Sequence, residues 1–428
     1  MADIASGDRN ALVGGPFGSD LVSRDYVESG VPVIRGANMG KGRWVSGDFV
    51  FVTPEKADSL SANCAKPGDL VFTQRGTIGQ VALVPDNEAD RYLISQSQMK
   101  LSVDPTKADA LFLFYVFSSE EHQNYIQQNA IRTGVPHTNL SILRTTPLRM
   151  PELDEQKAIA KVLSTLDAKI ELNQRMNEEL EGMAKLLYDY WFVQYDFPMS
   201  AAHAAALGMP HLTGHPYRAS GGPMTYHQTL KREIPKGWEV GNIFSVSDVG
   251  GGATPSKKAP EFWGGEVPFF TPTDARSETF CMDTEDHLSP IGIKNKATRL
   301  YPKGTVFITA RGSVGKAMII SKEMAMNQSC YALCPHPGIG SAFLYFHTLS
   351  LMDHLRLKSS GSVFDSIVTN DLSFTPAIAP SAEAITAFGQ IVEPMFESIL
   401  VNQIQTRELT TLRDWLLPML MNGQVKVS

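Results

Sequence analysis

The chain contains an internal repeat, and this repeat limits its possible architectures more than any other feature. Residues 67–81 have the sequence PGDLVFTQRGTIGQV, and residues 303–317 have the sequence KGTVFITARGSVGKA. Arg75 corresponds to Arg311, an offset of 236 residues (311 − 75 = 236). Chance would not preserve both the order and the spacing of such blocks, so the repeat predicts two copies of one globular domain. Further matches are Val31-Pro32 with Val267-Pro268 and Gln96-Ser97 with Gln328-Ser329.

Each globular copy is followed by a segment that predicts a long helix. Residues 151–191 and 380–420 are rich in Ala, Leu, Lys and Glu, and their apolar residues recur at steps of three and four. The offset here is 229 (402 − 173 = 229, for Asn402 and Asn173). About forty residues would extend roughly 60 Å as one unbroken helix. We expect Pro394 to kink or break the second helix, or to begin a new segment.

A narrow apolar stripe of this length favours pairing of the two helices in an antiparallel coiled coil, which would act as a spacer. The alternative is that each helix packs only on its own globular copy. Asn173 and Asn402 hold equivalent places on the stripe, and a polar residue in such a seam tends to fix the register. The predicted seam consists of Leu163, Leu166, Ile170, Asn173, Leu180, Val392, Met395, Ile399, Asn402 and Leu409, and the stripe extends to Met183, Leu187, Leu412 and Leu416.

The globular copies predict a mixed α/β (α+β) fold. Short β-rich runs such as residues 70–73 and 306–309 are bounded by Gly and Pro. Residues 198–222 have many Ala, Gly, His and Pro residues and little periodicity, which is typical of a surface linker. We therefore expect two similar globular domains separated by two long helices. The predicted boundaries are 1–150 (first domain), 151–192 (first helix), 193–233 (linker), 234–379 (second domain) and 380–428 (second helix).

Composition and motifs argue against several classes of protein. With 43% hydrophobic and 19% charged residues, the chain has the composition of a globular protein. We see no apolar run of about 18 residues and no secretory signal, so we expect no membrane span and a cytoplasmic location. Cys330, Cys334 and His336 lack the second ligand pair of a zinc site. The GSVGK of residues 312–316 lacks the spacing of a phosphate-binding loop, so we expect no bound nucleotide or metal.

The order of several motifs resembles a known family. The motifs are GGPFGSDL (residues 14–21), GVPVIRGANM (30–39), PGDLVFTQRGTIGQ (67–80), the helical segment 151–192 and REIPKGWEV (232–240). In this order, and repeated at this spacing, they resemble the specificity subunits of type I restriction–modification systems. The resemblance covers nearly the whole chain.

The resemblance implies a non-catalytic subunit with two target-recognition domains. Each domain would bind one half of a bipartite, asymmetric site in double-stranded DNA, and the helices would set the length of the gap between the halves. It further implies that the helices dock two modification subunits, which bind S-adenosylmethionine and methylate adenine. Restriction subunits would add ATP- and Mg-dependent translocation and cleavage, so this chain itself is expected to hold no cofactor. The alternative is an assembly scaffold that binds protein partners without sequence-specific DNA readout, and the net charge of −7 counts mildly in its favour.

Candidate DNA contacts come from the repeated turns and from the positions at which the copies differ. Arg75 and Arg311 lie in equivalent R-G-[ST]-[IV]-G turns, where an arginine can bind a phosphate or a guanine edge. The alternative is a tight turn whose arginine pairs with a core carboxylate. Shared residues should hold the DNA backbone, and differing residues, including Asp274, should contact bases. The full set is Arg35, Asn38, Lys41, Arg43, Gln74, Arg75, Thr77, Gln96, Gln98, Lys257, Lys258, Thr271, Thr273, Arg276, Arg311, Ser313, Lys316 and Gln328.

The two copies differ at their beginnings. The second opens with IPKGWEV before its glycine-rich run, whereas the first begins almost directly with SGDRNALVGGPFG. We expect that the opening strand of the first copy is short or missing, or that the C-terminal tail completes this copy, so the role of residues 1–13 stays open.

Overall fold

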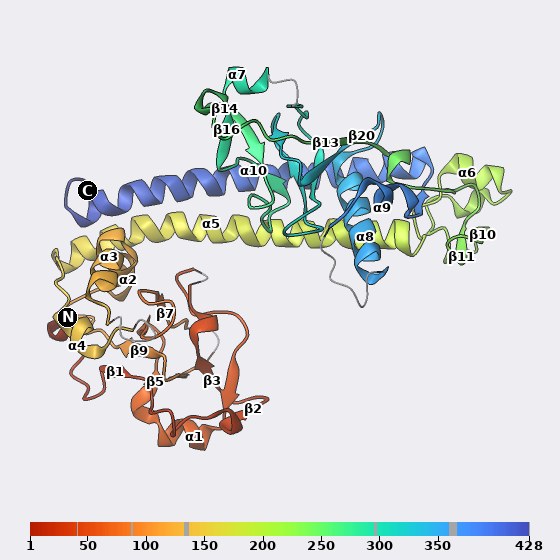
Figure 1. Cartoon of the computed structure of the whole chain (residues 1–428). Coiled ribbons are helices and arrows are strands. Elements are labelled where there is room, and N and C mark those ends of the chain that lie inside the picture. The colour runs from red at the N-terminus through yellow and green to blue at the C-terminus, as the bar shows by residue number, and fades with distance from the viewer. Residues whose placement is uncertain (41, 87–88, 132–136, 295–297, 359–365, 428) are drawn as a thin grey trace. The chain divides into compact units, whose positions relative to one another are not determined.

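The computed structural model describes residues 1–428 except 41, 87–88, 132–136, 295–297, 359–365 and 428. The chain divides into two compact units (Figure 1). Unit 1 consists of Met1–Glu171 with Arg407–Ser428, and unit 2 consists of Leu172–Thr406. The long helices α5 (Leu153–Tyr188) and α10 (Ala382–Met421) each contribute residues to both units. The fold is therefore mixed helix and sheet, with two domains separated by a long helix, as expected.

Unit 1 contains two small sheets. The first is antiparallel, in the order β1 (Leu12–Gly14), β9 (Gln98–Leu101), β6 (Leu70–Thr73), β7 (Val81–Leu83). The second has the order β2 (Tyr26–Val27), β4 (Val50–Val52), β3 (Val31–Ile34), β8 (Tyr92–Ile94), β5 (Cys64–Ala65). The helices are α1 (Pro54–Ser59), α2 (Ala110–Ser118), α3 (Glu120–Asn129), α4 (Leu140–Thr145) and the first half of α5.

Unit 2 repeats this arrangement. Its main sheet has the order β13 (Ser247–Gly251), β20 (Cys330–Pro335), β17 (Val306–Thr309), β18 (Ala317–Ile320), β15 (Phe280–Cys281). Its second sheet has the order β16 (Asp286–Leu288), β14 (Trp263–Phe270), β19 (Ala325–Met326). Two further strand pairs are β10 (Met224–His227) with β11 (Arg232–Pro235) and β12 (Glu239–Gly241) with β21 (Ala377–Ala379). The helices are α6 (Ala201–Ala206), α7 (Pro290–Ile293), α8 (Ser341–Lys358) and α9 (Thr369–Phe374).

Strand register confirms that the sequence repeat is a structural repeat. In unit 1 the order β9-β6-β7 matches the order β20-β17-β18 of unit 2. Both second sheets contain one parallel pair, with Val33 opposite Leu93 in unit 1 and Phe269 opposite Ala325 in unit 2. The central strands β6 and β17 are buried along their whole length, which explains why they appear in the sequence as short continuous apolar runs.

Within unit 2 the helices α5 and α10 pack antiparallel, and side-chain amides of Asn and Gln residues lie in the seam between them. Asn402 Nδ2 donates to Asn177 Oδ1 (2.9 Å), and Asn173 Nδ2 lies 3.4 Å from Gln405 Oε1. Residue numbers thus rise along α5 while those of the partners fall along α10. Asn173 is fully buried, so the predicted polar seam position is confirmed. Because a buried amide is satisfied only in the correct alignment, this layer favours one register.

Two details of the helix prediction are wrong. Met183 and Leu412 are 54% and 42% exposed, so they lie outside the seam. Pro394 neither breaks α10 nor starts a new segment, because the helix runs from Ala382 to Met421 without interruption. A kink at Pro394, the remaining predicted outcome, stays a prediction. Gln390, whose carbonyl loses its helical partner at Pro394, is exposed, so water can replace the missing hydrogen bond.

Residues 193–233 do not form the expected surface linker. Tyr195, Phe197, Met199 and Tyr217 are buried, and they belong to the same core cluster as the rings at the end of α5. Phe197 stacks on Tyr217 with ring centroids 4.7 Å apart. The aromatic residues are widely spaced among Ala, Gly and Pro, so they produce no periodicity that would reveal a packed segment.

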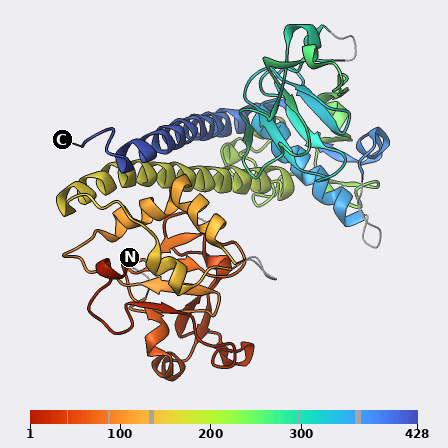
Figure 2. The ribbon, with the colours of Figure 1, turned by 60° about the vertical axis from the view of Figure 1, so that its left-hand side comes forward.

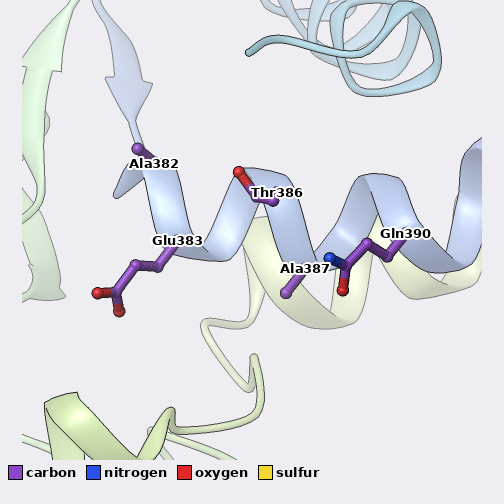
Figure 3. Close-up of a pocket in the computed structure, with 5 residues that line it drawn as sticks. All are labelled: Ala382, Glu383, Thr386, Ala387 and Gln390. Atoms are coloured by element: carbon purple, nitrogen blue, oxygen red, sulfur yellow. The ribbon is translucent and has the colours of Figure 1, made fainter.

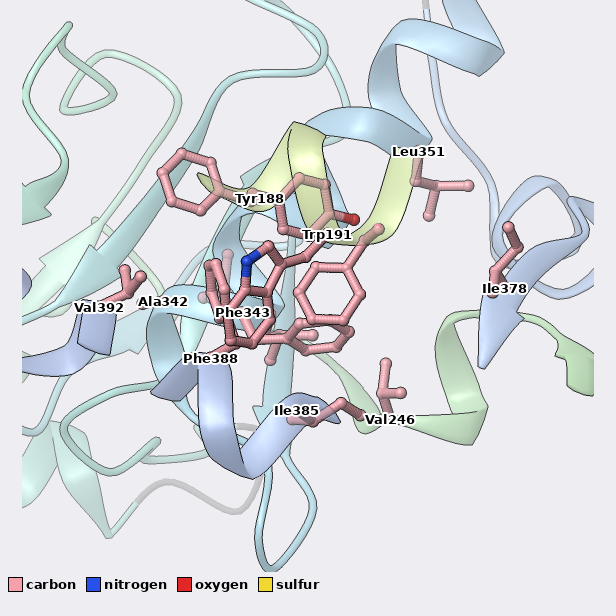
Figure 4. Packing of buried hydrophobic residues seen from close by; sticks show 14 of the residues in the cluster. Tyr188, Trp191, Val246, Ala342, Phe343, Leu351, Ile378, Ile385, Phe388 and Val392 are labelled. Carbon is pink, nitrogen blue, oxygen red and sulfur yellow. The ribbon is translucent and has the colours of Figure 1, made fainter. Parts of the chain in front are cut away.

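The core of unit 2 is built around aromatic rings from three helical segments. Figure 4 shows Tyr188 and Trp191 beside Phe343 of α8 and Phe388 of α10. Trp191 and Phe388 meet edge to face at 5.8 Å, a preferred geometry for aromatic pairs. The last turns of α5 are thus anchored in unit 2.

The last turns of α10 are anchored in unit 1 (Figures 1 and 2). Leu416, Leu417 and Leu420 pack in the same cluster as Ile4 near the N-terminus. Among the described residues of unit 1 no strand pair corresponds to β12 and β21. The C-terminal tail packs against the core of this unit through residues such as Met421 and Val427.

By length and composition, α10 is apolar enough to cross a membrane, contrary to our expectation that no segment is. One such helix is weak evidence, because the core helix of a soluble protein passes the same test. Val392, Phe396 and Ile399 of α10 are buried in the core of unit 2.

Candidate nucleic-acid interface

The R-G-[ST]-[IV]-G segments form the same turn in both units. In unit 1 the Thr73 amide donates to the Gln80 carbonyl (2.9 Å), and in unit 2 the Thr309 amide donates to the Lys316 carbonyl (3.0 Å). Both glycines of each turn have φ between 80° and 93°, a region that residues with a Cβ rarely adopt. The glycines are therefore required by the turn, which connects β6 to β7 and β17 to β18.

The arginines of these turns point away from the fold. Arg75 and Arg311 are exposed, and their guanidinium groups make no hydrogen bond or ion pair with the described residues. Their backbone amides donate to the carbonyls of Ser97 and Ser329 in equivalent fashion (3.4 and 3.2 Å). The alternative in which each arginine pairs with a core carboxylate is therefore not found, and both cations are available to a ligand.

The loops after β3 and β14 are stabilised by equivalent polar side chains. Asn38 Oδ1 accepts a hydrogen bond from the Arg35 amide (3.0 Å), and Asp274 Oδ2 accepts one from the Thr271 amide (2.8 Å). Both are buried, at 0% and 8% exposure. Short polar side chains commonly cap their own loop in this way. Our expectation that these two residues contact bases is therefore wrong, because they have one structural role in both units.

The glycine-rich loop that opens each unit (residues 14–21 and 250–258) lies against the turn that contains the repeated Gln-Ser pair (residues 96–97 and 328–329). A Cβ at Gly15 would collide with the Ser95 carbonyl oxygen, and a Cβ at Gly252 would collide with that of Asn327. In unit 2 the Thr254 hydroxyl also donates to Gln328 Oε1 (2.5 Å). Only glycine permits this approach of two backbones.

In each unit four loops therefore form one cluster, which we call the loop cluster. Lys316 Nζ donates to the Ala275 carbonyl (2.8 Å), and the Gln80 side-chain amide lies against Gly40, so the arginine turn also touches the loop after β3 or β14. The loop cluster consists of residues 14–21, 35–40, 42–43, 74–80 and 95–97 in unit 1, and of residues 250–258, 271–276, 310–316 and 327–329 in unit 2.

Most predicted contact residues lie in these clusters with accessible side chains. The exposed ones are Arg75, Thr77, Gln96, Lys257, Lys258, Thr273, Arg276, Arg311, Ser313, Lys316 and Gln328, and the partly buried ones are Arg35, Gln74 and Thr271. Lys41 lies outside the described residues. Lys257 is less available than its exposure suggests, because Nζ is 2.8 Å from Asp286 Oδ2 and lies over the Trp263 ring.

Two other predicted contacts are engaged within unit 1. Arg43 bonds to Glu171 Oε2 (3.2 Å) and to the Ser164 carbonyl (3.3 Å), so it anchors the loop on α5 and its side chain is only 12% exposed. Gln98 is fully buried and hydrogen-bonded to the Ser95 hydroxyl (2.5 Å). Neither can reach a base while unit 1 keeps this conformation.

Phe17 was missed by the sequence reasoning. It lies in the opening loop of unit 1 and is 82% exposed, although its neighbour Pro16 is buried. An aromatic residue between glycines in GGPFGSDL was the available signal.

The described residues hold no group of three or more His, Cys, Asp and Glu side chains placed to bind a metal. A surface depression of about 410 Å³ is lined by the first turns of α10, through Ala382, Glu383, Thr386, Ala387 and Gln390 (Figure 3). This lining contains a single ionisable side chain, Glu383, which accepts a hydrogen bond from Ser200 (3.0 Å). It offers no nucleophile paired with a base.

Comparison with known proteins agrees with this arrangement. The family model described as "Type I restriction modification DNA specificity domain" matches residues 24–182 and 235–408. The HindI specificity subunit of Haemophilus influenzae is 28% identical over 399 residues, covering 84% of this chain and 87% of the relative. The MjaIX specificity subunit of Methanocaldococcus jannaschii is 23% identical over 380 residues, covering 88% and 82%.

Among solved structures, the S subunit of a type I restriction–modification system from M. genitalium has a similar fold, with a TM-score of 0.56 and 18% identity. The match covers 96% of this chain and 92% of that one. Since the family model matches twice, with one match in each copy of the repeat and together more than half of the chain, the protein belongs to the family of type I restriction–modification DNA specificity subunits.

Proposed function

We propose that this chain recognises a bipartite, asymmetric sequence in double-stranded DNA, with one half of the site bound by each unit. The observation that carries the proposal is the recurrence of the loop cluster, with an exposed and unpaired arginine at the same place in both units. Shared arginines suit the phosphate backbone, which is the same at any sequence. Differing side chains, such as Gln74 in unit 1 and Arg276 in unit 2, suit base edges.

The long helices act in this proposal as a spacer and as a docking surface. On α5, within unit 2, the exposed apolar side chains lie within one face at helical spacing; they are Leu172, Met176, Met183 and Leu186. Such a face fits a helix of a partner protein, and the partners expected from the family are two modification subunits. The exposed apolar side chains of α10 would likewise dock a partner protein. They do not require α10 to lie in a lipid bilayer.

Catalysis belongs in this proposal to the partner subunits. S-adenosylmethionine would bind to the modification subunits, and ATP and Mg would bind to the restriction subunits. The chain would act in the cytoplasm, where its DNA substrate and these partners are found. Its own contribution is the choice of sequence.

Single-molecule sequencing of methylated adenines tests the function directly. Cells would carry this chain and its cognate modification subunit, with a control lacking this chain. We expect methylation at one two-part motif with a fixed gap. An active modification subunit that methylates no motif would refute DNA readout and favour the assembly scaffold.

A further inference from the structure

Phe17 is the most exposed of the large apolar side chains in the described part of the chain, at 82%. Its loop is nevertheless held firmly on both sides. The Gly15 amide donates to the Gln98 carbonyl (2.8 Å), Asn63 Nδ2 donates to the Gly14 carbonyl (2.7 Å), and the Asp20 amide donates to the Phe17 carbonyl (2.9 Å). The ring is therefore presented to solvent by an ordered turn, which lowers the entropy cost of using it in binding.

The surroundings of Phe17 indicate what it touches. Gly14 and Gly18 lie beside the side-chain oxygens of Gln74 and Gln96, two of the candidate base contacts. The only charged residue in segment 14–21 is Asp20, which is exposed. A carboxylate repels phosphates but accepts a hydrogen bond from the cytosine amino group. A loop with one phenyl ring and one carboxylate thus suits bases and not the DNA backbone.

We propose that Phe17 packs against the bases of the half-site bound by unit 1. This rests on the proposed function and names a specificity contact within it. Apolar side chains contribute to readout by packing on the thymine methyl group or by entering a base step. Unit 2 has no equivalent, because its opening loop, residues 250–258, is GGGATPSKK and contains no aromatic residue. The two half-sites are therefore read by different chemistry at this position.

The test compares Phe17→Ala with the unchanged chain, each assembled with its modification subunits. Binding is measured over a range of salt concentrations to the duplex defined by methylation sequencing, and to a duplex whose first half-site is scrambled. For Phe17→Ala we expect affinity for the cognate duplex to fall about ten-fold, an effect similar to that of one mismatched base pair. Affinity for the scrambled duplex should not change. The slope of log affinity against log salt should also stay the same, because an apolar side chain releases no counterions.

Phe374→Ala is the matched control, because Phe374 is 78% exposed but lies in unit 2, outside the loop cluster. It should leave binding to both duplexes unchanged. Three results would overturn the proposal: unchanged discrimination in Phe17→Ala, a changed salt slope, or weakened assembly with the modification subunits. If the unchanged chain showed no preference for any bipartite duplex, the proposed function would fail and this proposal with it. Discrimination kept by Phe17→Ala would refute the role of Phe17 alone.

Discussion

A buried polar network should hold the end of α10 in unit 1, and its removal should destabilise this unit selectively. Asp167 on α5 accepts hydrogen bonds from Arg413 Nη1 (2.9 Å) and from the Tyr115 hydroxyl (2.5 Å). The Asp167 side chain is 10% exposed and that of Arg413 is 29% exposed. The network joins α2, α5 and α10 through one carboxylate.

Arg413→Met would leave the carboxylate of Asp167 buried with one donor. Removing one partner of a buried ion pair typically costs about 3–5 kcal/mol. Because Arg413 is partly exposed, water can replace some of its interaction, so we expect a reduction in stability of about 2–3 kcal/mol. Removing the charge as well, in Asp167→Leu with Arg413→Met, should recover much of that reduction, since a buried ion pair is often replaceable by apolar residues.

Hydrogen exchange of the full chain measures this effect in each unit separately, which matters because a chain of two units need not unfold in one step. A reduction of about 2–3 kcal/mol corresponds to exchange about 30- to 150-fold faster at protected amides of α2 and the first half of α5. Amides of α8 in unit 2 should be unaffected. Arg175→Met is the control, because Arg175 is exposed and makes no hydrogen bond or ion pair with the described residues. Exchange less than about two-fold faster in Arg413→Met, or no recovery in the double variant, would refute the reasoning.

Three further predictions follow from the fold and the loop clusters. Arg75→Ala and Arg311→Ala should each weaken binding to cognate and scrambled duplexes alike. In titrations at several salt concentrations, the slope of log affinity against log salt should become less steep by about 0.9 for each phosphate that is no longer neutralised. An unchanged slope would contradict a contact with the DNA backbone. Burial lowers the pKa of His347 to about 4, below the value of about 6.5 in the unfolded chain. The unfolded chain therefore binds the proton more readily. The free energy of unfolding should fall as pH drops from about 6.5 towards 4, by about 3 kcal/mol at most. Unfolding of His347→Gln followed across this pH range should show a weaker dependence, and an equal dependence would exclude His347 as the cause. Insertion of one four-residue turn next to Asn173 adds about 6 Å of helix. Methylation sequencing should then show a gap between the half-sites that is longer by roughly two base pairs, with the same bases read. An unchanged gap would contradict the spacer role.

The sequence by itself determined the repeat, the two long helices and the family. Periodic apolar positions and matched glycines are local signals, since the period of a helix and the positive φ of a turn are set by neighbouring residues. For this reason the turns at Gly76 and Gly312, and the seam position of Asn173, were predicted correctly.

Only the tertiary structure decided which polar groups remain free. Arg75 and Arg43 look alike in the sequence, yet Arg75 is unpaired and Arg43 is bonded to Glu171, which is 128 residues away. Asn38 and Gln98 are fully buried: Asn38 also donates to the Asp48 carbonyl, and Gln98 accepts from the Ser95 hydroxyl. The sequence alone did not reveal this burial.

The sequence repeat did not reveal that the cores of the two units contain different residues at equivalent positions. The residue that corresponds to Asp167 in the second copy is Phe396 (396 − 167 = 229). Its ring is buried in unit 2 and packs against Phe346. The aromatic residues of segment 193–233 likewise became core residues only through packing with α5 and Trp238. Burial depends on which elements meet in space, and a linear pattern records this only when the packing repeats with the period of a helix or a strand.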